Sequence, residues 1–499
     1  MPGGGNPTGL RKRMQAIKEI VMHTGRYARM LLCAVFFLSG CAAVGPDYEK
    51  PDMKTADSWF TSENSAKLVD SSRSAQADWW LSLRDPQLAA LMEKAAAYNL
   101  DARIAEANIR EARALRNTVA AGQYPSLAAS AAPQRRGFSE RGLQQPQPGL
   151  RRDQDYYETG FDASWELDIF GRVRRVTEAA DARLAGAVEE RRDVLLSVFA
   201  EIARTYAELR GTQQRAAIME KNIALQAQTV HIVRQRYTNG DASEFDLTRA
   251  TAQLRNTEAA RPNLTADMRA NAHRLSVLTG EEPQALLEEL LRPIPPPALP
   301  DIIPTGLRSE ILRRRPDIRS AERQLAAATA DIGVAMADLF PRFFLTGYAG
   351  MQSVSFANLF QAGSIAYSLG PSIQWPIFRG GEIRARIQAQ EARADAAALR
   401  YEKAVLSALE DAETALTRYG EEFETQKRLQ KSAAAMRKAV MLARQRYALG
   451  EDGILAVVDA ERELVQTEDA LALSQTRIFT RLVAVYKALG GGWEVFEHQ

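Results

Sequence analysis

An internal duplication constrains the fold of this chain more than any other feature of its 499 residues. The tetrapeptide Arg-Gln-Arg-Tyr at residues 234–237, with Gly240 after it, recurs at residues 444–447 with Gly450 after it, an offset of 210 positions. Further matches keep the same order at offsets between 210 and 216: Leu278-Thr279-Gly280 with Leu489-Gly490-Gly491, Asp101-Ala102-Arg103 with Asp317-Ile318-Arg319, and Tyr124-Pro125 with Phe340-Pro341. Such self-similarity predicts two structural repeats of similar length.

A proline-rich segment separates the two repeats. Residues 292–297 read Arg-Pro-Ile-Pro-Pro-Pro, which is too rich in proline for a helix or a central strand. We therefore expect a first repeat over residues 85–290, a linker over residues 291–304, a second repeat over residues 305–493, and a short tail over residues 494–499. Each repeat is expected to contain one helix, two strands and a long helical hairpin.

Each repeat contains an unusually long helical pattern. Residues 172–237 lack proline, and at about 1.5 Å per residue this helix would reach roughly 100 Å. Apolar side chains recur every seven residues in the first repeat, and at alternating spacings of four and three in the second: Val188, Leu195, Ile202, Leu209, Ala216, Ile223, Val230 and Tyr237; Val405, Leu409, Ala412, Leu416, Tyr419 and Phe423. The pattern predicts packing against neighbouring helices, as in coiled coils.

The long helices end in a Tyr-x-x-Gly sequence. Tyr237 precedes Gly240 and Tyr447 precedes Gly450, so we expect a hairpin turn at each glycine. Return helices are expected over residues 243–278 and 454–489. Within the long helices, Gly211 and Gly420 occupy matching places; each costs about 1 kcal/mol relative to alanine, which indicates a close approach, a bend or a tolerated weakness.

Four strand-like segments complete the pattern. A helix over Asp85 to Gln123 and another over Thr305 to Leu339 should stop before Pro125 and Pro341, because proline disfavours helix in the preceding residue. The strands are expected over residues 124–132, 161–169, 342–351 and 365–378. In residues 161–169, apolar and polar side chains alternate, which is typical of a strand with one apolar face, in a membrane or in an ordinary half-buried sheet.

Four strands cannot close a barrel. An open sheet edge cannot face lipid, because its backbone N–H and C=O groups would have no hydrogen-bond partners. If these strands cross a membrane, the molecule must therefore be an oligomer. Since small outer-membrane barrels begin at about eight strands, two, three or four copies are all possible.

The N-terminus has the features of a bacterial signal peptide. A short apolar run, residues 30–40, follows Arg26 and Arg29 and ends in Leu-Ser-Gly before Cys41. The run is too short to cross a bilayer, so residues 1–40 are interpreted as a leader, with Met1, Met14 or Met22 as the start. The last residues resemble a lipobox, whose cysteine is acylated, and Ala42 resembles the outer-membrane sorting pattern. A buried helix with an incidental cysteine is the alternative. Residues 41–84 would then be a lipidated N-terminal segment.

Charge and residue usage exclude several classes of function. The 64 basic and 62 acidic residues nearly balance, which removes support for a nucleic-acid partner. With Cys33 in the leader and Cys41 acylated, no thiol remains for a disulfide, a nucleophile or a metal. The four histidines are not paired at ligand spacing: His23, His231, His273 and His498. We find no Walker, G-x-S-x-G or dinucleotide-binding motif. We therefore expect no enzyme, no metal and no cofactor other than the lipid on Cys41; a carboxylate-only enzyme stays open, but no pair is singled out.

These features together resemble the outer-membrane factors related to the TolC channel, and more closely their NodT- and OprM-like lipoprotein branch, which serves resistance-nodulation-division efflux pumps. The likeness covers residues 41–493 and rests on these segments: Cys41; Trp79-Trp80 with Asp85-Pro86-Gln87-Leu88; Arg314-Arg315-Pro316-Asp317-Ile318; Trp375-Pro376-Ile377-Phe378 with Gly380-Gly381; the paired Arg-Tyr-x-x-Gly turns; and Ala488-Leu489-Gly490-Gly491-Gly492-Trp493.

The resemblance implies an α+β membrane protein that works as a homotrimer. Twelve strands would form one outer-membrane β-barrel, and the helices a coiled-coil barrel reaching into the periplasm with an equatorial belt. The trimer would be the passive exit duct for drugs or toxic compounds that an inner-membrane pump delivers through a periplasmic adaptor. A channel for type I protein secretion, or a periplasmic coiled-coil structural lipoprotein, are the alternatives. The cargo, the pump and the adaptor cannot be read from this chain.

The resemblance also implies roles for the hairpin turns. Tyr237, Gly240, Tyr447 and Gly450 would lie at the adaptor-facing end. Asp246 and Asp459 match aspartates that ring the periplasmic aperture in relatives, each followed three residues later by an arginine: Arg249 and Arg462. The chain departs from the best-known member in having Asp452 at a basic tip position. Helix capping and an i,i+3 ion pair are the alternative explanation, since Ser243 and Asp246 form a capping-box sequence.

Overall fold

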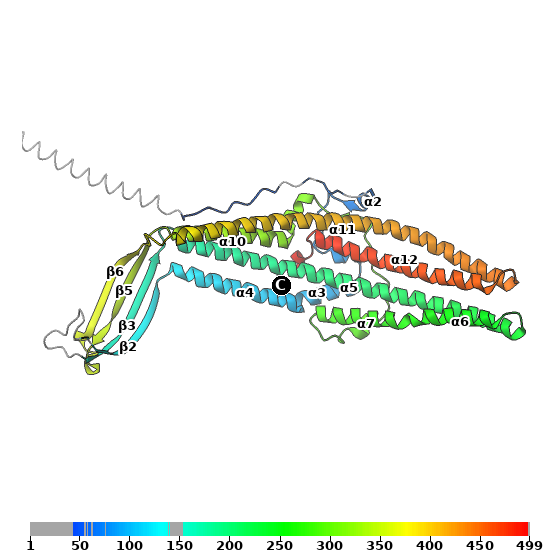
Figure 1. Ribbon diagram of the computed structural model, residues 1–499, viewed down its shortest axis with the longest axis horizontal. Coiled ribbons are helices and arrows are strands. Elements are labelled where there is room, and N and C mark those ends of the chain that lie inside the picture. Colours follow the sequence, from blue (N-terminus) through cyan, green and yellow to red (C-terminus); the bar gives the residue numbers. More distant parts are fainter. Residues whose placement is uncertain are drawn as a thin grey trace, which may run out of the picture. The chain divides into compact units, whose positions relative to one another are not determined.

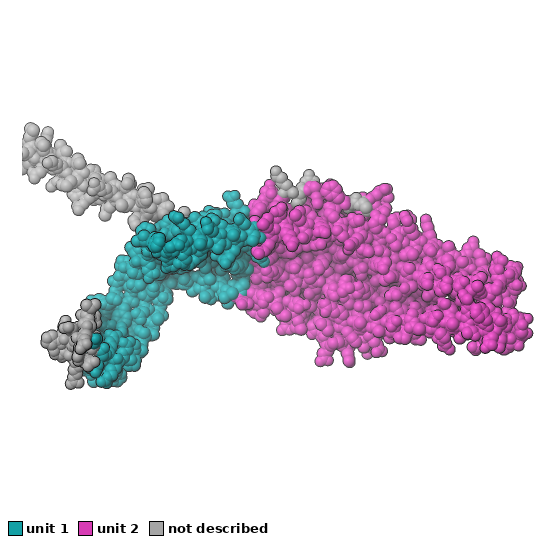
Figure 2. Space-filling model, in the orientation of Figure 1, with its two compact units in different colours: residues 1–49, 112–184, 324–397 teal, residues 50–111, 185–323, 398–499 magenta. Residues whose placement is uncertain are grey.

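The computed structural model describes residues 43–53, 56, 58–60, 63–74, 76–137, 139 and 153–497. The predicted leader and the acylation site at Cys41 lie outside these residues. The chain divides into two compact units: unit 1 comprises residues 112–184 and 324–397 with the N-terminal residues up to Glu49, and unit 2 comprises residues 50–111, 185–323 and 398–499 (Figure 2). Each unit therefore takes segments from both halves of the chain.

Unit 1 contains a four-stranded antiparallel sheet. Its strands are β2 (Ser126–Gly137), β3 (Asp153–Leu167), β5 (Arg342–Ser353) and β6 (Ile365–Gln374), and they lie side by side in the order β2-β3-β5-β6 (Figure 1). The two hairpins, one from each half of the chain, meet at β3 and β5, where Phe161 is paired with Ala349. Strand β6 continues through Pro371, which an edge strand tolerates because one side of it needs no ladder donor.

Two helices of equal length run through both units. Helix α5 spans Arg172–Asn239 and α11 spans Glu382–Leu449, with 68 residues each. The heptad pattern predicts several of the buried positions in unit 2, where Leu195, Ile202 and Leu209 are fully buried along α5. The same holds for Val405, Ala412, Leu416 and Tyr419 on α11.

The shorter helices are more broken than expected. The helix predicted from Asp85 is α3 (Pro86–Tyr98) followed by α4 (Leu100–Ala120). Asn99 makes the break: its side-chain oxygen accepts from the Ala102 N–H at 3.1 Å, as a helix cap does, and its amide donates to the Leu278 carbonyl at 2.8 Å. A local capping residue thus ends one helix and begins the next.

Prolines interrupt the other two predicted helices. In place of one helix over residues 305–339 there are α9 (Ile311–Arg314) and α10 (Pro316–Ala337), with Arg315 extended before Pro316. In place of one return helix over residues 243–278 there are α6 (Glu244–Ala259) and α7 (Arg261–Leu278), and Pro262 is the second residue of α7. Proline is favoured at the start of a helix and disfavours helix before it. The second return helix, α12 (Ile454–Ala488), is uninterrupted.

The N-terminal segment supplies much of the core of unit 2. Trp79, in a short 3-10 helix, stacks on Tyr486 of α12 with ring centroids 4.8 Å apart, and Trp80 stacks on Phe496 at 5.8 Å. Both tryptophans are almost completely buried. Strand β1 (Val69–Asp70) also pairs with β4 (Ile303–Pro304) at the end of the linker. Trp79 and Trp80 therefore pack against α12 and the C-terminal residues, and the strand pair joins the N-terminal segment to the linker.

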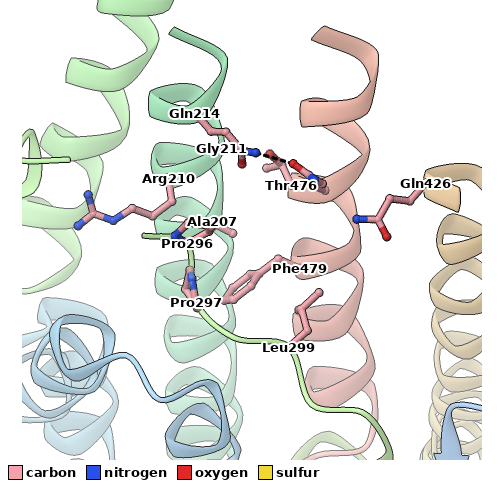
Figure 3. Close-up of a pocket in the computed structure, with 11 residues that line it drawn as sticks. Ala207, Arg210, Gly211, Gln214, Pro296, Pro297, Leu299, Gln426, Thr476 and Phe479 are labelled. Atoms are coloured by element: carbon pink, nitrogen blue, oxygen red, sulfur yellow. Dashed lines mark hydrogen bonds between the residues drawn. The ribbon is translucent and has the colours of Figure 1, made fainter. Parts of the chain in front are cut away.

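Gly211 marks a close approach between α5 and α12. A Cβ at this position would lie 1.9 Å from the Thr476 hydroxyl oxygen, so only glycine fits without a shift. A cavity of about 220 Å³ adjoins the contact, and linker residues Pro296, Pro297 and Leu299 form one wall of it (Figure 3). Gly420 is in equally tight contact, because a Cβ there would meet the Ser65 hydroxyl oxygen at 2.3 Å.

Among the residues that the structure describes, no helix combines the length and the apolar character needed to cross a lipid bilayer.

Candidate functional site

The sheet of unit 1 has two faces of opposite character. The register aligns Ala129, Phe161, Ala349 and Tyr367 across the four strands. Because alternate residues of a strand point to the same face, the register assigns one face these apolar side chains: Leu127, Ala129, Phe161, Ala163, Leu345, Ala349, Tyr367, Leu369 and Ile373. The other face carries mainly polar ones: Ser126, Ser130, Asp162, Ser164, Thr346, Tyr348, Ser368 and Ser372.

The apolar face is open to the surroundings. Tyr367 is 84% exposed, Leu369 78% and Ile373 63%. An exposed apolar area of this extent is typical of a surface that meets lipid or another protein. Strands β2 and β6 are the two edges of the sheet, so each leaves one row of backbone groups without a strand partner among the described residues. The single chain is therefore incomplete at both edges.

The two hairpin turns share one backbone geometry. Gly240 and Gly450 have φ of 85° and 78°, a region that favours glycine. The Gly240 N–H donates to the Tyr237 carbonyl at 3.1 Å and the Asp241 N–H to the Arg236 carbonyl at 2.8 Å, and Gly450 and Glu451 repeat the pattern. This is the Schellman arrangement, which ends a helix by satisfying its last carbonyls.

The predicted turn tyrosines differ between the repeats. Tyr237 is 41% exposed, whereas Tyr447 is only 9% exposed. The Arg236 guanidinium lies 4.5 Å above the Tyr447 ring and donates to the Ala448 carbonyl at 2.8 Å. Burial raises the pKa of the Tyr447 hydroxyl, and Arg236 opposes this shift. The C-terminal end of α5 is thereby bound to that of α11, and both turns lie at the same end of unit 2 (Figure 1).

Asp246 takes part in a complete capping box. Its carboxylate accepts from the Ser243 N–H at 3.1 Å and from the Ser243 hydroxyl at 2.8 Å, while the Ser243 oxygen accepts from the Asp246 N–H at 3.2 Å. These bonds satisfy backbone donors at the start of α6. Helix capping alone therefore explains why an aspartate occupies this position, whether or not it also lines an aperture.

Asp459 has a different environment. Gly453, not an acidic residue, is the N-cap of α12, and Asp459 lies beyond its first turn. The Asp459 carboxylate lies 3.7 Å from the guanidinium of Arg462 on its own helix, and also 3.7 Å from that of Arg249 on α6. The structure thus brings three of the four predicted aperture residues into contact. Asp452 stands at the tip position where we expected a departure from the basic residue of the best-known family member. Its carboxylate pairs with Arg446 at 2.9 Å within its own turn.

A buried polar network, which was not expected, lies deeper in the same bundle. The Glu461 carboxylate, 2% exposed, accepts from the Thr229 hydroxyl at 2.6 Å and lies 2.7 Å from the Arg444 guanidinium. Burial raises the pKa of the Glu461 carboxyl, although Thr229 and Arg444 oppose this shift. Arg444 belongs to the repeated Arg-Gln-Arg-Tyr segment, and this repetition is the sequence feature that could have pointed to the network. The network connects α5, α11 and α12.

The tip carboxylates do not form a metal site within one chain. Across the described part of the chain, no group of three or more His, Cys, Asp or Glu side chains is placed to hold a metal ion. The arrangement offers charged side chains at the turns and a conserved backbone geometry in both repeats of this chain, but no nucleophile beside a base.

Comparisons with known proteins give one consistent result. The family model described as "Outer membrane efflux protein" matches residues 91–281 and 307–491. The chain is 31% identical to the solvent efflux pump outer membrane protein SrpC of Pseudomonas putida over 95% of this chain and all of that protein. It is 30% identical to nodulation protein T of Rhizobium leguminosarum bv. trifolii, over 91% of this chain and 95% of that one. The solved structure of the outer-membrane channel OprN matches with a TM-score of 0.84 and 38% identity, over 91% of this chain and all of that one.

Proposed function

The chain belongs to the outer membrane efflux protein family, and from this premise we propose that three copies close their sheets into one barrel of twelve strands. It is an outer-membrane exit duct of an efflux system. Its family role is transport, which places it among channel proteins and not among enzymes.

One observation carries the trimer proposal: the sheet is apolar and exposed on one face, polar on the other, and unpaired at both edges. Outer-membrane barrels alternate apolar side chains toward lipid with polar side chains toward the lumen. Joining β6 of one copy to β2 of the next supplies the missing hydrogen bonds that lipid cannot supply. With four strands per copy, three copies give a barrel in the size range of small outer-membrane proteins.

The helices form the periplasmic part of the proposed duct. Helices α5 and α11 carry 68 residues each, which corresponds to about 100 Å at 1.5 Å per residue. Along the chain, the turns at Gly240 and Gly450 are separated from the strands by the full length of these helices. We assign the adaptor-facing end to these turns, with Tyr237 and Tyr447 beside them.

Asp246, Asp459, Arg249 and Arg462 would form the periplasmic aperture. Threefold repetition brings six carboxylates together, where mutual repulsion and the nearby arginines set the charge of the mouth. The contact of Asp459 with Arg249 supports this proposal, because it holds the two return helices together just beyond their first turns.

We also propose that Cys41 carries a lipid anchor and that the cargo consists of small molecules. A single acyl chain holds a protein to a bilayer only marginally, so the barrel supplies most of the membrane attachment. Relatives named for solvent efflux support small molecules as the class of cargo. The inner-membrane pump supplies the energy for transport, and the duct provides a passive path for the cargo.

Cysteine crosslinking tests the barrel closure directly. If Cys41 is acylated, the mature chain has no free thiol, so Ala132→Cys on β2 combined with Ser368→Cys on β6 introduces one reactive pair at the sheet edges. A short bismaleimide should give covalent species that end at three chains. The control pair Ser164→Cys and Thr346→Cys lies on the adjacent central strands β3 and β5, and should react within one chain only. Ladders that end at two or four chains, or no species above one chain, would refute the proposal.

A further inference from the structure

A wide groove in unit 2 carries an excess of positive charge. It has a volume of about 610 Å³ and lies between α5, α11 and α12, within the range of about 300–1,000 Å³ that is usual for small-molecule sites. Six basic side chains line it: Arg204, Arg315, Arg418, Arg477, Arg481 and Lys487. Three acidic side chains line it: Asp193, Glu410 and Asp411.

Half of the basic side chains are already neutralised. Arg204 pairs with Glu201 at 2.8 Å and with Glu208 at 2.6 Å. Arg315 pairs with Asp317 at 2.7 Å and with Asp411 at 3.2 Å, and Arg481 pairs with Glu422 at 3.1 Å: these contacts fix the walls of the groove.

The other three cations have no such partner. No carboxylate of the described chain lies within 4.0 Å of the charged groups of Arg418, Arg477 or Lys487. All three residues are exposed. Asp193 also lines this wall: burial raises the pKa of its carboxyl, and the charges of Arg315 and Lys487 oppose this shift. The open part of the groove therefore presents positive charge.

No described residue of the N-terminal segment lines the groove. On α12, the groove residues recur at spacings of three and four, as one face of a helix requires: Arg477, Thr480, Arg481, Ala484, Lys487 and Ala488. The opposite face of α12 is apolar and buried, and Tyr486 there stacks on Trp79. One face of α12 is thus buried by aromatic packing, while the face that lines the groove is polar and open.

We propose that this groove is an anion-binding station on the inner wall of the duct, which takes small molecules that carry two or more carboxylate, phosphate or sulfate groups. The inference rests on the proposed function, because only the polar, uncovered face of the helices can line an aqueous path. Arg418 and Arg477 bind the anionic groups through their guanidinium donors, which suit carboxylate and phosphate geometry. Lys487 adds a third charge. Threefold repetition places nine such cations around the path.

Block of single-channel current by citrate tests the station. The mature full-length protein is reconstituted in a planar bilayer in 0.1 M KCl, and the citrate concentration that halves the current is measured. Arg418→Ala with Arg477→Ala should raise this concentration about tenfold, which corresponds to about 1.4 kcal/mol. Lys487→Ala alone should raise it by a smaller factor, and Arg418→Lys with Arg477→Lys should keep most of the block. At 1 M KCl the block should weaken, because the Debye length falls from about 10 Å to about 3 Å.

The matched control removes two exposed arginines outside the groove. Arg84→Ala with Arg313→Ala changes the net charge equally, and neither residue lines the groove. This control should leave citrate block unchanged. Equal block in all variants, or equal loss of block in the control, would overturn the inference while the channel itself stands. If the wild-type protein forms no channel, the proposed function fails, and the inference fails with it.

Discussion

The Arg249 guanidinium on α6 lies 3.7 Å from the Asp459 carboxylate on α12, so the return helices of the two repeats are in contact near their first turns. Arg462 reaches the same carboxylate from within α12. Asp459 therefore accepts contacts from both repeats, whereas Asp246 is engaged with Ser243. This difference allows the capping and aperture roles of the two aspartates to be separated by mutation.

The double change Asp246→Ala, Asp459→Ala should raise single-channel conductance and reduce cation preference, because it removes the carboxylates proposed to ring the mouth. Its cost in stability should be small: about 1 kcal/mol for the lost cap and about 0–1 kcal/mol for an exposed ion pair. Ser243→Ala is the matched control, since it removes the capping box but keeps both carboxylates. If the double variant conducts like the wild type and melts earlier, as Ser243→Ala does, only the capping role remains.

Gly450→Val should weaken coupling to the adaptor without unfolding the sheet. Its φ of 78° is unfavourable for most residues with a Cβ and most of all for a β-branched one, although no neighbour lies within 4 Å. The turn must therefore change shape rather than relieve a clash. Gly450→Asn is the control, because asparagine tolerates this conformation. The measurement is adaptor capture by crosslinkers at residues 240 and 450. Capture from residue 360, but from neither turn, would show that the assigned orientation is wrong.

Two glycines of α5 should respond in opposite directions to alanine. Gly186→Ala should stabilise the protein by about 0.5–1 kcal/mol, because a Cβ there meets only an ordinary contact at 3.7 Å. Gly211→Ala should destabilise it by about 1–3 kcal/mol through overpacking, since its Cβ would overlap the Thr476 side chain. The melting temperatures of the two variants, compared with that of the wild type, test this prediction. A Gly211→Ala variant that melts no earlier than the wild type would mean that α5 and α12 do not approach so closely.

The buried Glu461 should make stability depend on pH. Its folded-state pKa is raised above the ordinary 4.5 by burial, so between pH 4.5 and that raised value the folded state holds more protons than the unfolded state. Stability from this group is therefore greatest below pH 4.5 and falls as pH rises through the folded-state pKa. Glu461→Gln should remove this part of the dependence when melting is followed from pH 4 to pH 8. An unchanged pH profile in Glu461→Gln would exclude Glu461 as its source.

Local patterns predict the parts of the fold that local physics decides. The heptad pattern predicts the burial of Ile202 and Leu416. The positive φ of Gly240 is expected because this glycine directly follows a long helix. The break at Asn99 is missed: its side-chain oxygen caps α4 through the nearby Ala102 N–H, but its amide is held by the Leu278 carbonyl, far along the chain. The break near Ala260 could have been predicted from the sequence, because Pro262 indicates the start of a new helix.

The candidate site shows the same division. The Ser243–Asp246 capping box is readable from spacing and is present in the structure. The stacking of Trp79 on Tyr486, and the network of Thr229, Arg444 and Glu461, join segments more than two hundred residues apart. No sequence period encodes such pairings, because they depend on how the two repeats pack together.

Single-channel recording from the purified mature protein in a planar bilayer shows directly whether this chain forms an exit duct. We expect discrete, long-lived conductance steps from a species of three chains, and larger steps after Asp246→Ala with Asp459→Ala. A preparation that is folded by circular dichroism and assembled as a trimer, yet leaves the bilayer current at baseline, would contradict the assignment of this chain as an exit duct.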